Sequence, residues 1–308
     1  FPLKAILNTS LLNISAMANL SEDRLLNYEN LEKKHEALWI KTFGQKTSQD
    51  KIKSDVEFSL KTTGIIAGID KEISTDFILG FAISYLHSNI KTANGLQNNV
   101  ISSYQTEVYT RKYFDDYFFD NFAGISLNKF NQKRSIEAIG EDATSSYFGQ
   151  NFLLKSKFGK KINLENNFIL TPHTSLKYVF NNLPSYKEKG ADELNLNVSS
   201  ITANFLESSI GADIGWQTTL PKIEYNDFKF SHLTSLLNIS YSHFLIADKP
   251  TLKAKLQNQT TGFDYKISQI DKSRLDLGFL ISLYNEYDAV FNLNLKRSVR
   301  KTSQTNFV

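Results

Sequence analysis

Histidine, serine and carboxylate side chains are the groups of this sequence that could carry acid–base, nucleophilic or metal chemistry. The five histidines stand outside H-E-x-x-H and comparable metal-ligand spacings; they are His35, His87, His173, His232 and His243. The chain has no cysteine, which excludes thiolate metal sites, a cysteine nucleophile and disulfides. We therefore expect no metal and no cofactor.

One histidine stands where a hydrolase would need it. His173 falls on the same strand face as Thr171 and Ser175, so a Ser/His pair is one interpretation. A histidine that is only hydrogen-bonded is the interpretation we favour. A G-x-S-x-G elbow, a Walker loop and a G-x-G-x-x-G turn are all absent from the sequence. We therefore expect that the protein is not an enzyme.

The aspartates Asp70, Asp213 and Asp276 could in principle form an acid–base couple, but they belong to three different segments. We expect each to pair with a lysine, an arginine or a helix instead.

The segments that carry these residues alternate with period two, as half-buried strands do. In residues 63–70, 77–85, 209–217 and 275–283 one face is apolar and the other is rich in Gly, Ser and Asp. Small polar residues suit a confined, water-filled lumen better than the exposed face of a soluble sandwich. The predicted pore-lining set is Gly64, Gly68, Asp70, Gly80, Ser84, Ser209, Gly211, Asp213, Gly215, Asp276 and Gly278.

Composition supports a transmembrane β-barrel. The mean hydropathy of −0.31 and the lack of a long apolar run exclude transmembrane helices, whereas a barrel spreads its lipid face over every second residue. The balance of 35 Lys+Arg against 32 Asp+Glu gives a net charge of +3, so we expect no nucleic-acid partner.

The predicted connections alternate between long and short, as in a meander whose two ends face different compartments. The long ones are residues 45–57, 87–103, 131–146, 181–204 and 247–272; the short ones are 72–75, 115–116, 159–166, 220–227 and 285–286. Aromatic residues flank two short turns and predict a girdle at the lipid interface: Phe114, Tyr117, Phe118 and Phe119 at one turn, Tyr284 and Tyr287 at the other.

Residues 21–38 differ from the rest because they lack Gly, Pro and β-branched side chains. Ser21 is a plausible N-cap, and a helix of this length would measure about 27 Å, close to the thickness of a bilayer core. Its thin apolar face fits a polar lumen, although a solvated linker helix is the alternative. We therefore divide the chain into a linker and pore helix, residues 1–36, and a barrel, residues 37–308.

Several motifs resemble the autotransporter β-domain of type V secretion. Residues 38–44, with Trp39, Lys41, Phe43 and Gly44, are similar to its opening strand, and Gly64-x-x-x-Gly68-x-Asp70 is similar to its second. Further matches are residues 79–85, Thr171-Pro172 followed by Leu176 and Tyr178, and Tyr186-x-Glu188-x-Gly190. The resemblance covers most of residues 38–300, and the abundance of Asn, Lys and Ile resembles rickettsial surface antigens.

The resemblance implies an all-β, antiparallel up-and-down barrel of about twelve strands in the bacterial outer membrane, with an N-terminal helix in the lumen. It implies a translocator and anchor that displays an N-terminal passenger at the cell surface. The implied partners are outer-membrane lipid, the passenger and the barrel-assembly machinery, and we expect a monomer. A porin is the alternative function, against which the predicted pore helix argues.

Two departures from the family pattern stand out. Residues 287–296 read as an eleventh strand, which leaves only 305–308 for a twelfth, too short to span, and the family's terminal aromatic is missing at Val308. Asn27 and Asn30 are isolated, so self-cleavage at an Asn-Asn pair in the pore helix is not expected.

Overall fold

A computed structural model describes residues 3–28, 37–50, 57–225, 228–267, 270–285, 290–301 and 303–307. One long helix, α1 (Leu3–Tyr28), precedes the strands of these ranges. The strands are β1 (Ala37–Gln49), β2 (Phe58–Ser74), β3 (Phe77–Thr92), β4 (Gln97–Phe114), β5 (Tyr117–Ile136), β6 (Glu141–Lys160), β7 (Ile162–Asn163), β8 (Phe168–Leu183), β9 (Tyr186–Lys187), β10 (Leu196–Val198), β11 (Ile201–Tyr225), β12 (Phe228–Ala247), β13 (Thr251–Leu256), β14 (Gly262–Lys266), β15 (Ser273–Asn285), β16 (Val290–Val299) and β17 (Ser303–Phe307). Two short 3₁₀ turns lie at Glu165–Asn167 and Asp192–Leu194.

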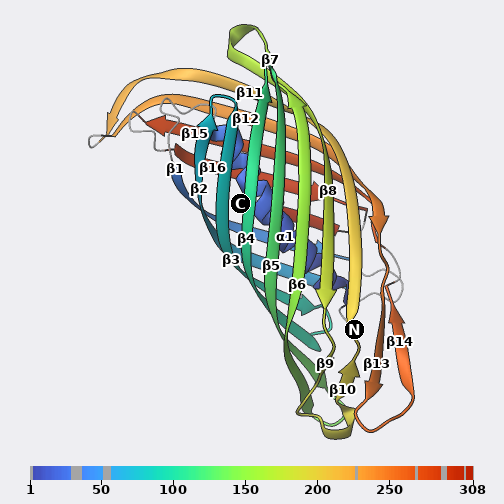
Figure 1. Ribbon diagram of the computed structural model, residues 1–308. Coiled ribbons are helices and arrows are strands. Elements are labelled where there is room, and N and C mark those ends of the chain that lie inside the picture. The colour runs from blue at the N-terminus through green and yellow to red at the C-terminus, as the bar shows by residue number, and fades with distance from the viewer. Residues whose placement is uncertain are drawn as a thin grey trace.

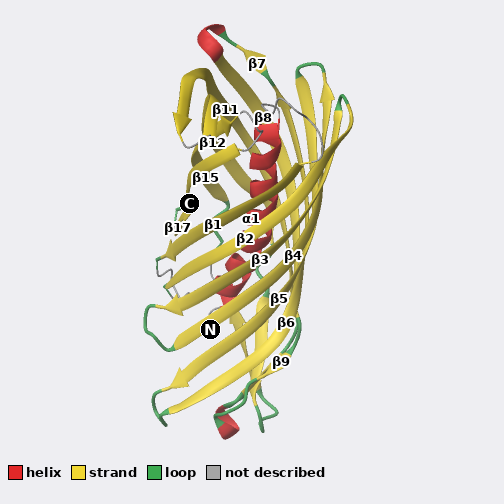
Figure 2. Ribbon diagram, turned by 90° about the vertical axis from the view of Figure 1, so that its left-hand side faces the viewer, coloured by secondary structure: helices red, strands yellow, loops and turns green. Residues whose placement is uncertain are grey.

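Twelve of these strands close into an antiparallel barrel around α1 (Figures 1 and 2). Their order is β1-β2-β3-β4-β5-β6-β8-β11-β12-β15-β16-β17, and β17 pairs with β1 to complete the ring. Closure removes the open edges of the sheet where β17 pairs with its two neighbours, whereas, among the described strands, residues 37–44 of β1 pair with β2 alone. The prediction of an up-and-down barrel with a helix in its lumen is thereby confirmed. No helix in the described ranges has the length and apolarity to cross a bilayer.

The closing strand is short, as its sequence predicts. β17 pairs with β1 between Gln45 and Gln49 and with β16 between Lys296 and Val299. Beyond this junction, the remainder of β1 and β16 flank a cavity of about 630 Å³ that reaches α1. The predicted eleventh strand corresponds to β16, and residues 287–289 lie outside the described ranges.

The two ends of the barrel differ. At the end that we call the turn end, β2 joins β3 and β4 joins β5 through two residues each, 75–76 and 115–116. At the opposite end, the loop end, β8 joins β11 through residues 184–200 and β12 joins β15 through 248–272. These two connections form a second sheet, β14-β13-β10-β9, at the lower end of Figure 1. Tyr186 of this sheet stacks on Tyr147 of β6 at 4.3 Å, and burial raises the pKa of Tyr186.

Two of the predicted long connections are mostly strand. β3 and β4 are joined by residues 93–96, and β5 and β6 by 137–140, so the polar stretches 87–103 and 131–146 extend the barrel wall towards the loop end. These stretches are polar because the strands extend beyond the membrane, where their outer faces are in contact with water. Backbone pairing continues there even though the apolar alternation has ended.

An apolar belt encircles the barrel towards the turn end. On β2 the outward side chains Ile65, Ile69 and Ile73 are exposed, and towards the loop end they give way to Thr63 and Lys61. Eight residues of strand between Ile73 and Ile65 span about 26 Å, the height expected of a lipid-facing band before tilt. Other exposed members of the belt include Leu38, Ile40, Phe81, Ile83, Ile125, Phe152, Leu154, Ile210, Ile214, Ile239, Leu277, Phe279, Leu293 and Leu295.

The predicted aromatic girdle is only partly right. Phe114, Tyr117 and Phe119 are exposed at the turn end, where lipid and water meet. Phe118 points inward, because its neighbours in the alternation face out, and its ring lies 4.4 Å from the Arg111 guanidinium. Tyr284 is also buried and stacks on His232. Tyr287 lies outside the described ranges.

The predicted helix has the wrong bounds. α1 begins at Leu3, so Ser21 is no N-cap but a buried residue of the helix interior, and Leu38 already belongs to β1. Residues 29–36 lie outside the described ranges. The 26 residues of α1 span about 39 Å rather than 27 Å. The sequence conceals the first part of α1 because the barrel surrounds it on every side and no single apolar stripe is required.

The belt yields a direct test. Ile214 is exposed on the lipid face of β11, so Ile214→Arg should lower the free energy of unfolding of the inserted barrel by about 2–4 kcal/mol if the residue lies near the midplane. Urea titration in lipid vesicles measures this. Thr202→Arg, on the same face of β11 but towards the loop end, is the control and should have little effect. Equal stability of Ile214→Arg and the unaltered chain would contradict the assignment.

Candidate functional site

The lumen is filled by α1, whose described side chains from Leu3 to Leu26 are all buried or half-buried. Towards the loop end the contacts are apolar: Leu3, Ile6, Leu7 and Ile14 of α1 share one core cluster with barrel residues such as Phe130. Hydrogen bonds also cross this layer: Asn13 Nδ2 donates to both Ser88 Oγ and Ser103 Oγ at 3.0 Å. The expected polar lumen is therefore polar only in part.

Towards the turn end the helix is held by ion pairs. Arg24 of α1 donates two hydrogen bonds to Asp70 of β2, from Nε at 2.8 Å and from Nη2 at 2.9 Å. Tyr109 Oη donates a third at 2.9 Å, and Trp39 Nε1 in turn donates to Tyr109 Oη at 2.9 Å. All four side chains are buried. A buried carboxylate is tolerated when its lone pairs are satisfied in this way.

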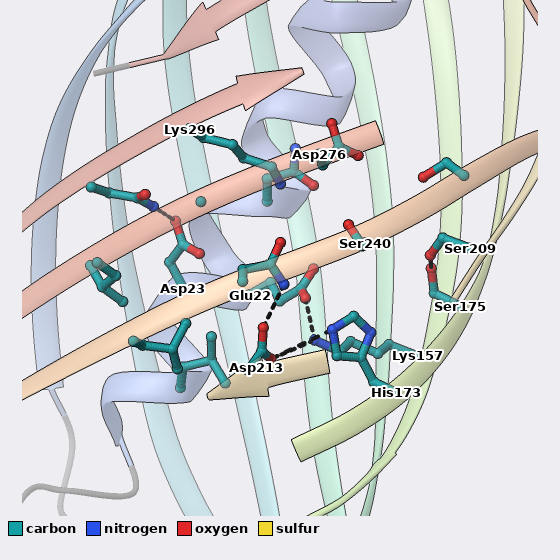
Figure 3. Close-up of a pocket in the computed structure, with 18 of the residues that line it drawn as sticks. Glu22, Asp23, Lys157, His173, Ser175, Ser209, Asp213, Ser240, Asp276 and Lys296 are labelled. Carbon is teal, nitrogen blue, oxygen red and sulfur yellow. Dashed lines mark hydrogen bonds and ion pairs between the residues drawn. The ribbon is translucent and has the colours of Figure 1, made fainter. Parts of the chain in front are cut away.

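A second group joins α1 to β6 and β11 (Figure 3). Glu22 accepts hydrogen bonds from Lys155 and from Lys157, the latter at 2.6 Å. Lys157 also lies 3.7 Å from Asp213, which accepts a hydrogen bond from Asn238. The side chains converge on a cavity of about 80 Å³ beside the helix.

Two further ion-pair groups line the same wall. Glu207 contacts Lys177 at 2.9 Å and Arg274 at 3.1 Å, and Arg274 continues to Asp276 at 2.8 Å. Arg111 forms a bidentate pair with Asp120 at 2.7 and 2.8 Å and donates to the Leu25 carbonyl oxygen of α1 at 3.2 Å. The expected pairing of Asp70, Asp213 and Asp276 with basic residues or the helix is confirmed.

The predicted pore-lining residues all occupy strand positions that point into the barrel, but they differ in what they contact. Ser84, Ser209, Asp213, Asp276 and Gly278 lie near α1 or line the cavity beside it, and Gly211 and Gly215 lie on the same inner face. The remaining glycines make room for aromatic rings. A β-carbon at Gly80 would overlap the Tyr109 ring, one at Gly68 the Trp39 ring, and one at Gly64 the Phe43 ring.

Most charged residues of the inner wall were missed by sequence reasoning, which singled out small polar residues and three aspartates. Lys155, Lys157, Lys177, Glu207 and Arg111 stand at inward positions, and the first four have the outward apolar neighbours Leu154, Phe158, Leu176 and Leu206, respectively. That alternation is a usable signal, because a charge in register with the inner face of a spanning strand must find a partner in the lumen.

No hydrolase constellation is assembled around His173 in the described part of the chain. Ser175 Oγ hydrogen-bonds with Ser209 Oγ at 2.6 Å, and neither imidazole nitrogen of His173 has a hydrogen-bond partner there. Its Nε2 lies 3.6 Å from Asp213 Oδ2. Likewise, no group of three or more His, Asp or Glu side chains among these residues could hold a metal ion.

A closed, lipid-facing antiparallel barrel whose lumen is occupied by an N-terminal helix is the architecture of an outer-membrane translocator domain. The chain belongs to the autotransporter family, because the model of the autotransporter beta-domain matches residues 38–294. It is an outer-membrane translocator and anchor of a bacterium, as its sequence predicts, and domains of this class serve transport.

Relatives come from rickettsiae, as the composition suggested. The chain is 24% identical to Outer membrane protein A of Rickettsia conorii over 274 residues, which are 83% of this chain and 13% of that protein. It is 26% identical to Outer membrane protein B of Rickettsia prowazekii over 198 residues, 59% of this chain and 12% of that protein. The chain thus spans only a small part of the curated relatives that it matches.

Solved structures agree on the fold. The translocator domain of the autotransporter NalP from Neisseria meningitidis matches with a TM-score of 0.71 at 16% identity, covering 96% of this chain and 94% of that one. The beta domain of the Bordetella autotransporter BrkA matches with a TM-score of 0.65 at 10% identity, covering 89% and 97%.

The Arg24–Asp70 pair gives a second test. Asp70→Asn leaves a buried guanidinium without its carboxylate and should lower the free energy of unfolding by about 3–5 kcal/mol. Arg24→Met should cost a similar amount, and the double variant should cost clearly less than the sum, because the two changes remove one shared interaction.

Urea unfolding in vesicles checks this cycle. Asp142→Asn is the matched control, because its pair with Lys133 is about half exposed, so its loss should change the free energy of unfolding little. Strict additivity of Arg24→Met and Asp70→Asn would contradict the coupling.

Proposed function

We propose that this chain exports a passenger attached ahead of α1 across the bacterial outer membrane and then anchors it at the cell surface. The direction of α1 carries this proposal. Its first turns reach the loop end, where Asn8 Nδ2 donates to Gln49 Oε1 at 3.3 Å, and its last turns reach Arg111 and Asp70 towards the turn end. A segment that precedes α1 therefore leaves the lumen on the loop side. In outer-membrane barrels the longer loops face the exterior.

The division that we propose assigns residues 1–36 to the linker and pore helix and residues 37–308 to the barrel. The conduit used during export is lined by the eleven inward positions named above, from Gly64 to Gly278. After export, α1 closes this conduit. The cavity between α1 and the wall at β11 and β15 is only about 80 Å³, which supports a plug rather than the open lumen of a porin; the larger cavity lies at the seam of β1 and β16.

The proposal includes no catalytic role for the barrel, since the Ser/His geometry around His173 lacks its central hydrogen bond. It also includes insertion by the barrel-assembly machinery and function as a monomer. The ring of paired strands supports a monomer, because β1 meets β17 of its own chain rather than a strand of a second copy.

Single-channel conductance tests the plug. Deleting residues 1–36 should raise the conductance severalfold in a planar bilayer, because the lumen then holds water instead of α1. The intact chain should conduct poorly. High conductance that is already present in the intact chain would favour the porin alternative. A shift in electrophoretic mobility between cold and boiled detergent samples reports whether the deletion variant has folded.

The absence of cysteine allows a test of the exported state. Asn13→Cys with Ser103→Cys places two thiols on facing side chains of α1 and β4, at a pair joined in the structure by a 3.0 Å hydrogen bond. In cells that display an epitope fused ahead of residue 1, this pair should form a disulfide. Asn13→Cys with Ser59→Cys, where Ser59 is on the outer face of β2, is the control and should not. Display of the epitope without the Asn13–Ser103 disulfide would contradict a seated helix.

A further inference from the structure

We propose that the barrel exterior carries a binding site for the phosphate groups of an outer-leaflet lipid, formed by Lys46, Lys61 and Arg297. This site goes beyond translocation and anchoring. It rests on the register of four neighbouring strands, on the position of the apolar belt and on the charge of the exposed face.

Strand register places the three cations in one row. Arg297 of β16 pairs with Asn306 of β17, Asn306 pairs with Lys46 of β1, and Lys46 pairs with Lys61 of β2. All four residues are exposed on the outer face. At the usual strand spacing, Lys46 and Lys61 are about 5 Å apart at the backbone, and Arg297 is about 10 Å from Lys46.

The pairing of Lys46 with Lys61 is unfavourable by itself, because like charges directly opposite each other repel. Within the described residues, neither lysine forms an ion pair. The nearest exposed carboxylates along the two strands are Asp50 and Glu57, each four residues towards the loop end, which is about 13 Å of strand. An anion between the two ammonium groups would relieve this repulsion.

The lipid-facing surface at the turn end handles its charge differently. Lys112 of β4 is partly exposed there and forms an ion pair with Asp76 of the turn between β2 and β3. The Lys112 ammonium also holds the pKa of the Asp76 carboxyl below its usual value. The positive charge of Lys112 is thus compensated by a carboxylate of the protein, whereas a ligand would have to compensate the charges of Lys46 and Lys61.

The row lies where the apolar belt ends. On β16, the next outward side chain from Arg297 towards the turn end is Leu295. On β2, the second outward side chain from Lys61 in the same direction is Ile65. Both are exposed members of the belt. A lipid whose acyl chains lie along Leu295, Ile65 and Ile40 would therefore bring its headgroup to the row. Lys and Arg side chains reach from such positions to phosphate oxygens.

The side of the membrane identifies the lipid. The row is on the loop side of the belt, which faces the exterior in an outer-membrane barrel. The outer leaflet of that membrane is built from phosphorylated lipid A, whose headgroup supplies anionic oxygens for Lys46 and Lys61. The occupant is therefore a lipid-borne phosphate with its acyl chains in the belt, and free phosphate in solution lacks the second half of this contact.

Binding of lipid A to the full chain in detergent micelles tests the site. Diphosphoryl lipid A and its dephosphorylated form are each titrated, and native mass spectrometry measures the bound fraction. The intact chain should prefer the phosphorylated lipid by at least about tenfold, a preference that must shrink with added NaCl because exposed charges are screened. Inorganic phosphate at the same concentration should not displace the lipid.

The variant Lys46→Gln/Lys61→Gln should bind the two lipids within about twofold of each other, because its phosphate contacts are gone. The control Lys253→Gln/Lys255→Gln removes the same charge from the exposed sheet at the loop end and should behave like the intact chain. The proposal is overturned by an unchanged preference in Lys46→Gln/Lys61→Gln, by no preference in the intact chain, or by displacement with inorganic phosphate.

Discussion

The need to pair every backbone N–H and C=O group in lipid governs this structure. A strand that spans the membrane can meet that need only through neighbours on both sides, so the sheet must return to its first strand. Here the return depends on five residues of β17, which meet both β16 and β1 at the loop side of the belt and leave a cavity between those two strands further towards the turn end. Once the ring is closed, each strand has one face towards lipid and one towards the lumen. The exposed isoleucines and the buried ion pairs follow from that single requirement.

Closure creates an interior that needs its own core, and α1 provides it. In the half of the lumen towards the loop end, leucine and isoleucine side chains of the helix pack as they would in a soluble protein. In the other half, Glu22 and Arg24 meet basic and acidic side chains from separate strands. Charges buried in this way contribute little net stability but penalise any helix position that leaves them unpaired. The apolar contacts thus hold α1 in the lumen, and the ion pairs fix its position along the barrel axis.

The barrel could be predicted from the sequence because lipid and lumen impose opposite preferences on alternate residues, as at Ile65 and Gly64. The helix bounds could not be predicted, because a segment enclosed on all sides shows no apolar stripe, and Asn13 finds its partners Ser88 and Ser103 only after the barrel has formed. The inward glycines were read as open lumen. Gly80 and Gly68 instead accept the rings of Tyr109 and Trp39, a contact between strands that no local pattern reveals. The ion pairs of Asp70, Asp213 and Asp276 were expected, but their partners could not be named, since several of those partners are far apart from them in sequence.

The course of α1 through the lumen also has a mechanical meaning. A passenger outside the cell pulls on the helix along its axis, and the contacts from Asn8 to Arg24 are spread along that axis. Such a load acts on them together, in shear, rather than opening them one after another as in peeling. Resistance to detachment is then governed by the rate at which the whole helix slips, not by its equilibrium stability. A non-covalent plug of this geometry can serve as a tether.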